Sequence, residues 1–210
     1  MNRPKDWWGN PANAKKWIKQ NARRTNEHGI NTTTESTKIV VDEIMTRSKD
    51  FFNVLEVGAG DGRIIGALSQ KPHKTLGLKK CYSCDINPEL SAYILEKYRL
   101  VMPHLDPAEI INLPFDDNSF DLVYTYQVLQ HVHPEEIEKA ILELCRVAKK
   151  EVWMWEGIGR QECPHGSQTH KAHNGSWAYK IDRFVNCYEV SIPRNVNITL
   201  ERQRLYKVKV

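Results

Sequence analysis

The sequence has no apolar run of the length that crosses a bilayer, which takes about 18 residues or more, so we expect no membrane span. Its opening residues, Met1 to Asp6, are polar and lack the apolar middle region of a secretory signal. The five cysteines are odd in number and too sparse for a disulfide scaffold. Such cysteine usage favours a reducing compartment, and we expect the protein in the cytoplasm.

A four-cysteine zinc site is also missing. Cys81 and Cys84 form one C-x-x-C pair, and no second pair completes a set of four ligands. The histidines of the late polar stretch are spaced too loosely for the i, i+4 pairing of metal-binding helices. We therefore expect no metal, although the cluster invites a test: it contains Cys163, His165, His170 and His173.

The chain has no sustained basic stripe with interleaved aromatic residues, the pattern typical of proteins that bind single-stranded nucleic acid. The formal net charge is only +4, and the basic residues fall in short pairs such as Lys15-Lys16 and Arg23-Arg24. A modest basic patch can still steer an anionic ligand. A small molecule is thus the favoured partner, and nucleic acid stays open as an alternative.

What the chain does contain is enough apolar material for one core. Of its 210 residues, 40% are hydrophobic and 27% are charged, which are ordinary globular proportions. We expect a single domain over residues 1–210. Within it we expect a helical flap (1–50), a cofactor-binding core (51–156), an insert on the substrate side (157–186) and C-terminal strands (187–210).

Strand-like and helix-like segments alternate through the middle of the chain. The predicted strands are Phe51–Val57, Cys81–Asp85, a stretch between Leu100 and Ile111, Phe120–Tyr126 and Glu151–Trp155, and the predicted helices are Ile64–Leu68, Pro88–Leu100 and Pro134–Val147. This alternation predicts an α/β fold with a mostly parallel sheet and crossover helices on both faces. Pro103 and Pro107 place the third strand at a sheet edge. The last two candidate strands, 187–192 and 196–210, predict an antiparallel hairpin at one edge.

A glycine-rich turn follows the first predicted strand, in the run Glu56-x-Gly58-x-Gly60-x-Gly62. Glycines let the backbone approach a ligand closely, and the helix that follows offers free N–H groups. The dinucleotide fingerprint needs a third glycine where this chain has Arg63, which counts against a nucleotide-dependent oxidoreductase. The acid before the first glycine suits a ligand with an ammonium group better than a pyrophosphate.

A second acid closes the next predicted strand. Asp85 opens the run Asp85-Ile86-Asn87-Pro88, which taken alone also reads as a helix cap. One βαβ unit after a glycine turn, such an acid accepts hydrogen bonds from both hydroxyls of a ribose. We therefore expect Asp85 to bind the ribose of the cofactor.

These features together resemble a known family over Val54 to Glu156. The glycine run is similar to the first motif of class I methyltransferases that use S-adenosylmethionine (SAM), and the stretch from Leu113 to Asp121 resembles the L-P-F-x-D-x-S-F-D motif of their small-molecule members. The resemblance implies a Rossmann-like sheet of seven strands, with SAM as cofactor and S-adenosylhomocysteine (SAH) as product. It implies these cofactor-binding residues, with Asp106 as a rival to Glu109: Glu56, Gly58, Ala59, Gly60, Asp61, Asp85, Ile86, Glu109, Ile110, Tyr126 and Gln127.

Methyl transfer of this kind is an in-line attack by an O, N or S atom of the acceptor, and alignment supplies much of the catalysis. An oxygen or nitrogen nucleophile also loses a proton, for which the candidate bases are His131, Glu156 and His173. The alternative for His131 is a histidine at a helix start whose neighbours satisfy it. His133, which precedes Pro134, is expected at the surface.

Acceptor choice is expected from Asp6–Glu35 and from Gly157–Phe184. Trp7, Trp8 and Trp17 of the first segment either close over the cofactor and exclude water or pack the flap against the core.

A narrower resemblance, to methylases associated with pseudaminic acid biosynthesis, rests on Leu142–Gly157 and Trp177–Phe184. The expected function is methyl transfer to a small molecule, with a sugar-linked acceptor as one candidate. The alternatives are an RNA or protein methyltransferase and a SAM-binding protein without catalysis.

Overall fold

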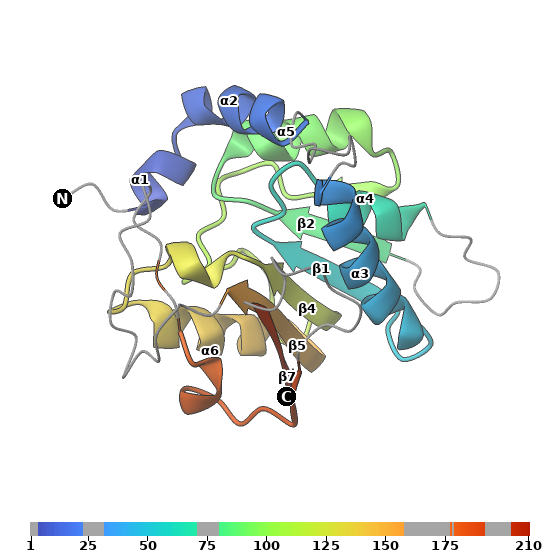
Figure 1. Ribbon diagram of the computed structural model, residues 1–210, viewed down its shortest axis with the longest axis vertical. Coiled ribbons are helices and arrows are strands. Elements are labelled where there is room, and N and C mark those ends of the chain that lie inside the picture. The colour runs from blue at the N-terminus through green and yellow to red at the C-terminus, as the bar shows by residue number, and fades with distance from the viewer. Residues whose placement is uncertain (1–3, 23–31, 71–79, 158–176, 178, 192–202) are drawn as a thin grey trace.

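The computed structural model describes residues 4–22, 32–70, 80–157, 177, 179–191 and 203–210 (Figure 1). Its centre is a seven-stranded sheet with the order β3-β2-β1-β4-β5-β7-β6. The strands are β1 (Asn53–Val57), β2 (Lys80–Cys84), β3 (Val101–Pro103), β4 (Phe120–Tyr126), β5 (Ala148–Gly157), β6 (Glu189–Ser191) and β7 (Gln203–Lys209). β1 to β5 run parallel, whereas β7 is antiparallel to both β5 and β6. The predicted α/β fold, with an antiparallel pair of strands at one edge, is confirmed.

Helices cover both faces of this sheet. One face carries α3 (Thr32–Thr46), α4 (Arg63–Ser69) and α5 (Pro88–Lys97), and the other carries α6 (Ile137–Val147). The predicted helical flap (1–50) is divided, because α3 packs into the core beside the sheet. We keep the name flap for the two N-terminal helices, α1 (Pro4–Trp8) and α2 (Pro11–Ala22), and α2 lies along α5 in Figure 1. Two short 3₁₀ turns, η1 (Leu129–His131) and η2 (Ile181–Arg183), complete the elements.

The core forms two layers, one on each side of the sheet. Neighbouring residues of a strand point to opposite faces. Val54 and Leu122 accordingly pack with α3 and α4, while Leu55 and Val123 pack with α6. Because β1 and β4 are buried on both faces, they appear in the sequence as short, mainly apolar runs.

The same alternation separates the two cysteines of the C-x-x-C pair. Cys81 is buried in the core beneath α3 and α4, and Cys84 is buried in the core beneath α6. Both thiols are free, and burial raises the pKa of the Cys81 thiol to about 12. The pair therefore does not share one metal site or redox centre.

Several ends of helices and strands differ from those predicted. α6 begins at Ile137 rather than Pro134, and α5 ends at Lys97 rather than Leu100. β5 begins at Ala148, directly after α6, and no glycine or proline separates the two elements. The predicted edge strand is confirmed as β3, which ends at Pro103.

A buried ammonium joins α3 to the antiparallel strands. Lys207 of β7 is only 4% exposed, and its Nζ donates to Glu43 of α3 at 2.8 Å and to Glu189 of β6 at 3.0 Å. The same Nζ lies 4.5 Å from the ring centroid of Trp153. A buried charge is costly unless it is paired, so these contacts favour one arrangement of α3 and β6 around β7.

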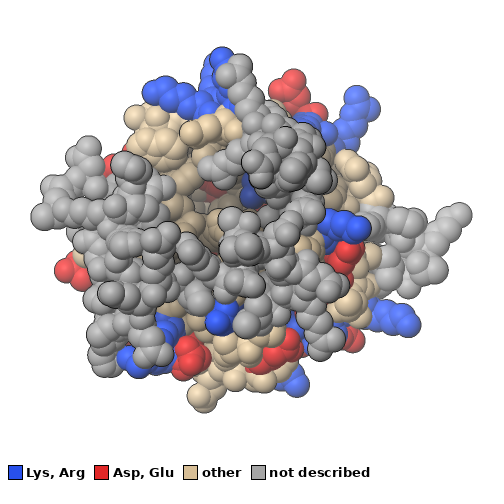
Figure 2. All heavy atoms as spheres, viewed as in Figure 1, with Lys and Arg blue, Asp and Glu red and all other residues tan. Residues whose placement is uncertain are grey.

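The surface of the described residues mixes acidic and basic side chains. Figure 2 shows blue and red side chains interspersed around the visible face, without a continuous field of one sign over the described atoms. None of the described helices has both the length and the apolar character needed to cross a membrane.

Close packing at Gly66 in α4 generates a stability prediction. A Cβ on Gly66 would lie 2.5 Å from two ring carbons of Tyr98, which is closer than real side chains approach. We expect Gly66→Ala to lower the free energy of unfolding by about 1–3 kcal/mol, the usual cost of overpacking, as measured by urea denaturation. Gly157→Ala is the matched control, since its Cβ would meet Gln130 Oε1 at an ordinary 3.7 Å. Equal losses in the two variants would contradict this packing.

Candidate functional site

The carboxyl ends of β1, β2 and β4 open onto a cleft of about 700 Å³. Small-molecule sites fall in the range of roughly 300–1,000 Å³, and in open α/β sheets they lie at this edge. The cleft is lined by the glycine turn after β1, by the segments that follow β2 and β4, and by the flap. It therefore collects residues from across the sheet and from the N-terminus.

The glycine turn forms the floor of the cleft. Gly58, Gly60 and Gly62 have φ values of 71°, 59° and 68°, which side chains other than glycine rarely adopt. A Cβ on Gly58 would also lie 2.6 Å from Val128. The amides of Gly58 and Ala59 donate to the Cys84 carbonyl at 2.9 and 3.2 Å, so the turn is held against the end of β2.

Asp85 stands at the end of β2 and is buried. Its two oxygens accept hydrogen bonds from the Gly60 and Asn87 amides, each at 2.9 Å. Burial raises the pKa of Asp85 to about 6, and these two amides oppose the shift. Since a carboxylate oxygen can accept more than one hydrogen bond, Asp85 retains acceptor capacity toward the cleft.

Glu56 of β1 is 3% exposed, and its Oε2 accepts a hydrogen bond from the Ile65 amide in the first turn of α4 at 3.0 Å. Burial raises the pKa of Glu56 to about 8, while the Tyr124 hydroxyl and the Ile65 amide lower it. A cationic group in the cleft would favour the ionised form of this carboxyl. Glu56 thus both binds the first turn of α4 and lies in the wall of the cleft.

The segment after β3 reaches the cleft through Glu109 and Ile110, both of which line it. The Ala108 amide donates to the Asp85 carbonyl at 2.9 Å, which holds this segment beside the end of β2. Asp106, the rival acid, is exposed and is not among the lining residues. The structure therefore places Glu109, rather than Asp106, in the cleft.

The segment after β4 forms the opposite wall. Gln127 has a φ of 57°, unusual for a residue other than glycine, and its amide donates to the Trp155 carbonyl at 2.7 Å. The Arg63 guanidinium lies 5.7 Å from the ring centroid of Tyr126 and pairs with Asp61 at 3.1 Å. Backbone strain of this kind often occurs at functional sites, where it is part of the positioning.

Glu156 does not line the cleft, contrary to its prediction as a base. The side chain is 2% exposed, and its Oε1 accepts hydrogen bonds from the Thr125 hydroxyl at 3.0 Å and the Val128 amide at 3.1 Å. Burial raises the pKa of Glu156 to about 7, against the lowering effect of the amides at the start of η1. The residue therefore holds the backbone before η1, while its Oε2 is buried without a hydrogen-bond partner among the described residues.

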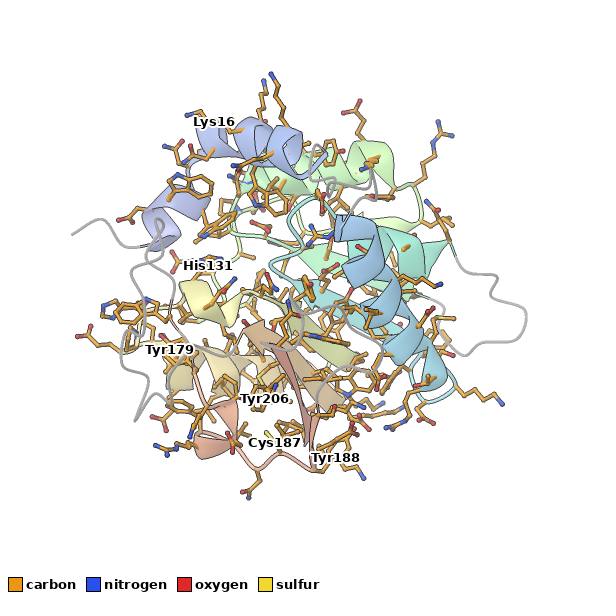
Figure 3. The ribbon with its side chains drawn as sticks, in the orientation of Figure 1. Lys16, His131, Tyr179, Cys187, Tyr188 and Tyr206 are labelled. Atoms are coloured by element: carbon orange, nitrogen blue, oxygen red, sulfur yellow. The ribbon has the colours of Figure 1, made fainter. Side chains whose placement is uncertain are left out.

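His131 is the last residue of η1 and lines the cleft. Its Nδ1 is buried and has no hydrogen-bond partner among the described residues, whereas its Nε2 lies 3.3 Å from Gln130 Nε2. Burial lowers the pKa of His131 to about 4, so the ring is neutral near pH 7. Figure 3 shows this side chain between η1 and the flap.

The flap closes one side of the cleft. Asn87 Nδ2 donates to the carbonyls of Trp8 and Asn10, at 2.9 and 3.1 Å, and thereby fixes the turn between α1 and α2. The Trp8 ring lies 4.8 Å from the His131 ring and 5.9 Å from the Trp17 ring, measured between centroids. Trp17 packs over the glycine turn, where a Cβ on Gly60 would overlap it. The tryptophans thus both hold the flap and line the cleft.

Most predicted cofactor-binding residues meet in this cleft. The exception is Asp61, whose carboxylate faces Arg63 and is not a lining residue. His173 and the cluster around Cys163 lie outside the described residues, and no group of metal-binding side chains occurs among those described. The predicted residues that do line the cleft are Glu56, Gly58, Ala59, Gly60, Asp85, Ile86, Glu109, Ile110, Tyr126, Gln127 and His131.

Sequence reasoning missed several polar residues that line the cleft or hold its flap, among them Arg63, Asn87, Gln130, His133 and Glu136. Arg63 was considered only as a missing glycine, and Asn87 only as a helix cap, a role it also fulfils by accepting from the Glu89 amide. His133 was expected at the surface, yet it lines the cleft and contacts the Trp177 ring at 5.5 Å. The hydrogen bonds from Asn87 to the flap span too much sequence for a local pattern to show them.

The part of the chain that forms much of the cleft matches the model of a protein family. Residues 55–155, from β1 to β5, match a model described as a methyltransferase domain. A curated relative, phosphoethanolamine N-methyltransferase 1 of Triticum aestivum, is 30% identical over 135 residues, or 62% of this chain. The match covers only 25% of the wheat protein, so the chain spans about a quarter of that relative's length.

Solved structures share the fold over almost the whole chain. A magnesium protoporphyrin IX methyltransferase from Synechocystis PCC 6803 with bound SAH has a TM-score of 0.66 at 13% identity, covering 95% of this chain and 97% of that one. The N-methyltransferase NodS of Bradyrhizobium japonicum WM9, in complex with SAH, has a TM-score of 0.65 at 12% identity, covering 94% and 98%. At such identities the likeness concerns the fold alone.

The raised pKa of Glu56 predicts a pH dependence of stability. Folding shifts this pKa from the ordinary 4.5 to about 8, so between these values the folded state holds more protons at Glu56 than the unfolded state does. The resulting stabilisation is complete below pH 4.5 and is lost as the pH rises toward 8. Glu56→Gln removes this dependence, so the variant should gain stability relative to the parent as the pH increases.

Urea denaturation of both proteins across this pH window measures the difference. Glu96→Gln, on the exposed side of α5, is the matched control and should follow the parent at every pH. A constant difference between Glu56→Gln and the parent would show that Glu56 keeps the same protonation in both states.

Proposed function

We propose that the protein transfers a methyl group from SAM to a small-molecule acceptor, on the basis that residues 55–155 match the model of a methyltransferase domain. The bond formed joins the methyl carbon to an O, N or S atom of the acceptor, and SAH is the other product. SAM supplies an electrophilic methyl group on a sulfonium centre. Alignment of the acceptor with that methyl group is then the main task of the protein.

The observation that carries this proposal is the pairing of Asp85 with the glycine turn. The Asp85 carboxylate is fixed by the Gly60 amide at 2.9 Å, on the wall of a cleft of about 700 Å³. A buried acid at this position suits the two hydroxyls of a ribose. Ile86 and Ile110, which also line the cleft, offer apolar contacts to an adenine ring, with Glu109 beside them.

The amino acid portion of SAM has matching partners near the turn. Glu56, in the ionised form, suits its ammonium group. Arg63 Nε is buried without a hydrogen-bond partner among the described residues, and the side chain lines the cleft, so it suits the carboxylate. Tyr126 and Gln127 would bound the methionine chain on the side of β4.

Among the candidate bases, His131 is the described residue that lines the cleft with an unpartnered nitrogen. It would accept a hydrogen bond from the acceptor and orient it. Glu156 would act only as a positioning residue, through its hydrogen bond to the Val128 amide before η1. His173 stays a prediction.

The acceptor is proposed to be a small molecule, as the names of the wheat and Synechocystis proteins state for theirs. A sugar-linked acceptor, expected from the narrower resemblance, stays one candidate. Nucleic acid is less well supported, because the described surface in Figure 2 carries no continuous basic field.

SAM binding tests the site assignment directly. Asp85→Ala should weaken the affinity for SAM by about 100-fold, because two hydrogen bonds to a charged acceptor are lost. Isothermal titration calorimetry with SAM, SAH and NADH measures the effect. Asp106→Ala, an exposed acid outside the cleft, is the matched control and should bind SAM like the parent.

Thermal unfolding of Asp85→Ala would verify that the variant is folded. Unchanged SAM affinity in folded Asp85→Ala would refute the ribose assignment. Binding of NADH in place of SAM would refute the proposed function itself.

A further inference from the structure

One part of the cleft lining is not assigned to the cofactor. It comes from α1, η1 and the segment between η1 and α6, and we call it the acceptor end: Trp7, Trp8, Gln130, His131, His133 and Glu136. These residues are linked to one another through Trp7–Trp8 and Trp8–His131 ring contacts and a 2.8 Å hydrogen bond from the Glu136 amide to the His133 carbonyl.

The acceptor end is rich in aromatic rings held in place. The ring centroids of Trp7 and Trp8 are 4.6 Å apart, and those of Trp8 and His131 are 4.8 Å apart. Asn87 fixes the Trp8 carbonyl at 2.9 Å, which restrains the position of this ring. Aromatic faces attract cations, most strongly where water is excluded, and indole does so best.

The charges at the acceptor end also favour a cation. Of the four carboxyl side chains in the described lining, Glu56, Asp85 and Glu109 are assigned to the cofactor, and Glu136 belongs to the acceptor end. The single guanidinium of the described lining, Arg63, is assigned to the cofactor as well. Arg63 is paired with Asp61 at 3.1 Å. Lys16 is exposed and points outward from α2 in Figure 3. No lysine occurs among the described lining residues, so an anionic acceptor would meet no second cation there.

The need to remove a proton from the acceptor also favours an amine over an alcohol. An alcohol must lose a very weakly acidic proton before or during attack, and the described base at this end is a poor one, because burial lowers the pKa of His131 to about 4. An amine reaches the cleft mainly as an ammonium ion near pH 7, and the proton that it must first give up to water is far more acidic than that of an alcohol. The neutral amine then has a free lone pair. The amine nitrogen forms the new bond to the methyl carbon as the carbon–sulfur bond breaks, and that electron pair stays on sulfur.

In this step the positive charge moves from sulfur to nitrogen, and the methylated ammonium then releases a proton to water. Indole rings and a carboxylate beside the nitrogen stabilise the charge as it develops.

We propose that the acceptor is a small amine, received between Trp8, His131 and Glu136. This inference rests on the proposed function and specifies its substrate class. His131 Nδ1, buried and unpartnered among the described residues, would accept a hydrogen bond from the amine N–H and direct the lone pair toward the methyl group.

A set of three probes on one carbon skeleton tests the proposal: butylamine, butan-1-ol and butyrate. Each is titrated into protein saturated with SAH, and isothermal titration calorimetry measures its affinity. We expect butylamine to bind about tenfold or more tighter than butan-1-ol, with butyrate the weakest. Equal affinities, tighter binding of butyrate, or binding of none of the three would overturn the proposal.

Variants assign the effect to the acceptor end. Trp8→Leu should abolish the preference for butylamine over butan-1-ol, and Trp8→Phe should retain most of it, because an aromatic face remains. Glu136→Gln should weaken butylamine binding severalfold, whereas Glu138→Gln, at an exposed position of α6, should leave it unchanged. A preference that survives both Trp8→Leu and Glu136→Gln would place the amine elsewhere.

SAH affinity, measured first on each protein, separates this proposal from the proposed function. A protein that binds SAH and then prefers butan-1-ol or butyrate would retain the proposed function and lose the amine assignment. Failure to bind either SAM or SAH would reject both.

Discussion

The buried carboxylate of Asp85 is the constraint on which the rest of the cleft depends. A carboxylate without hydrogen bonds in such a place would be strongly destabilising. Its oxygens therefore hold the amides of Gly60 and Asn87, which belong to two different strand-to-helix connections. The glycine turn and the start of α5 are thereby brought to one point, and the cofactor site forms around it.

Asn87 extends this constraint to the N-terminus. While its backbone amide donates to Asp85, its side chain donates to Trp8 and Asn10 of the flap. The acid proposed to bind ribose and the aromatic ring proposed to bind the acceptor are therefore joined through a single residue. The hydrogen bonds of Asn87 therefore link the proposed cofactor site to the flap, which fits a reaction that depends on alignment and exclusion of water.

Much of the fold could be predicted because its signals are local. Alternating apolar runs and helical segments predicted the sheet, and the spacing of Glu56, the glycines and Asp85 predicted which side chains meet. The position of Glu156 outside the cleft lining could not be predicted, since it depends on the packing of β5 and η1. The hydrogen bond from the Asn87 side chain to the Trp8 carbonyl was missed because the two residues are 79 positions apart in the sequence. The short β6 depends on pairing with β7, and the early start of β5 depends on the pairing of Ala148 with Phe120 of β4. No local pattern specifies either pairing.

A crystal structure of the SAH complex would test the central claim, that this cleft is the active site of a methyltransferase. The account predicts ribose hydroxyls within hydrogen-bond distance of Asp85, adenine between Ile86 and Ile110, and the sulfur atom directed toward Trp8 and His131. SAH bound outside the cleft, or with its sulfur directed away from the flap, would contradict it.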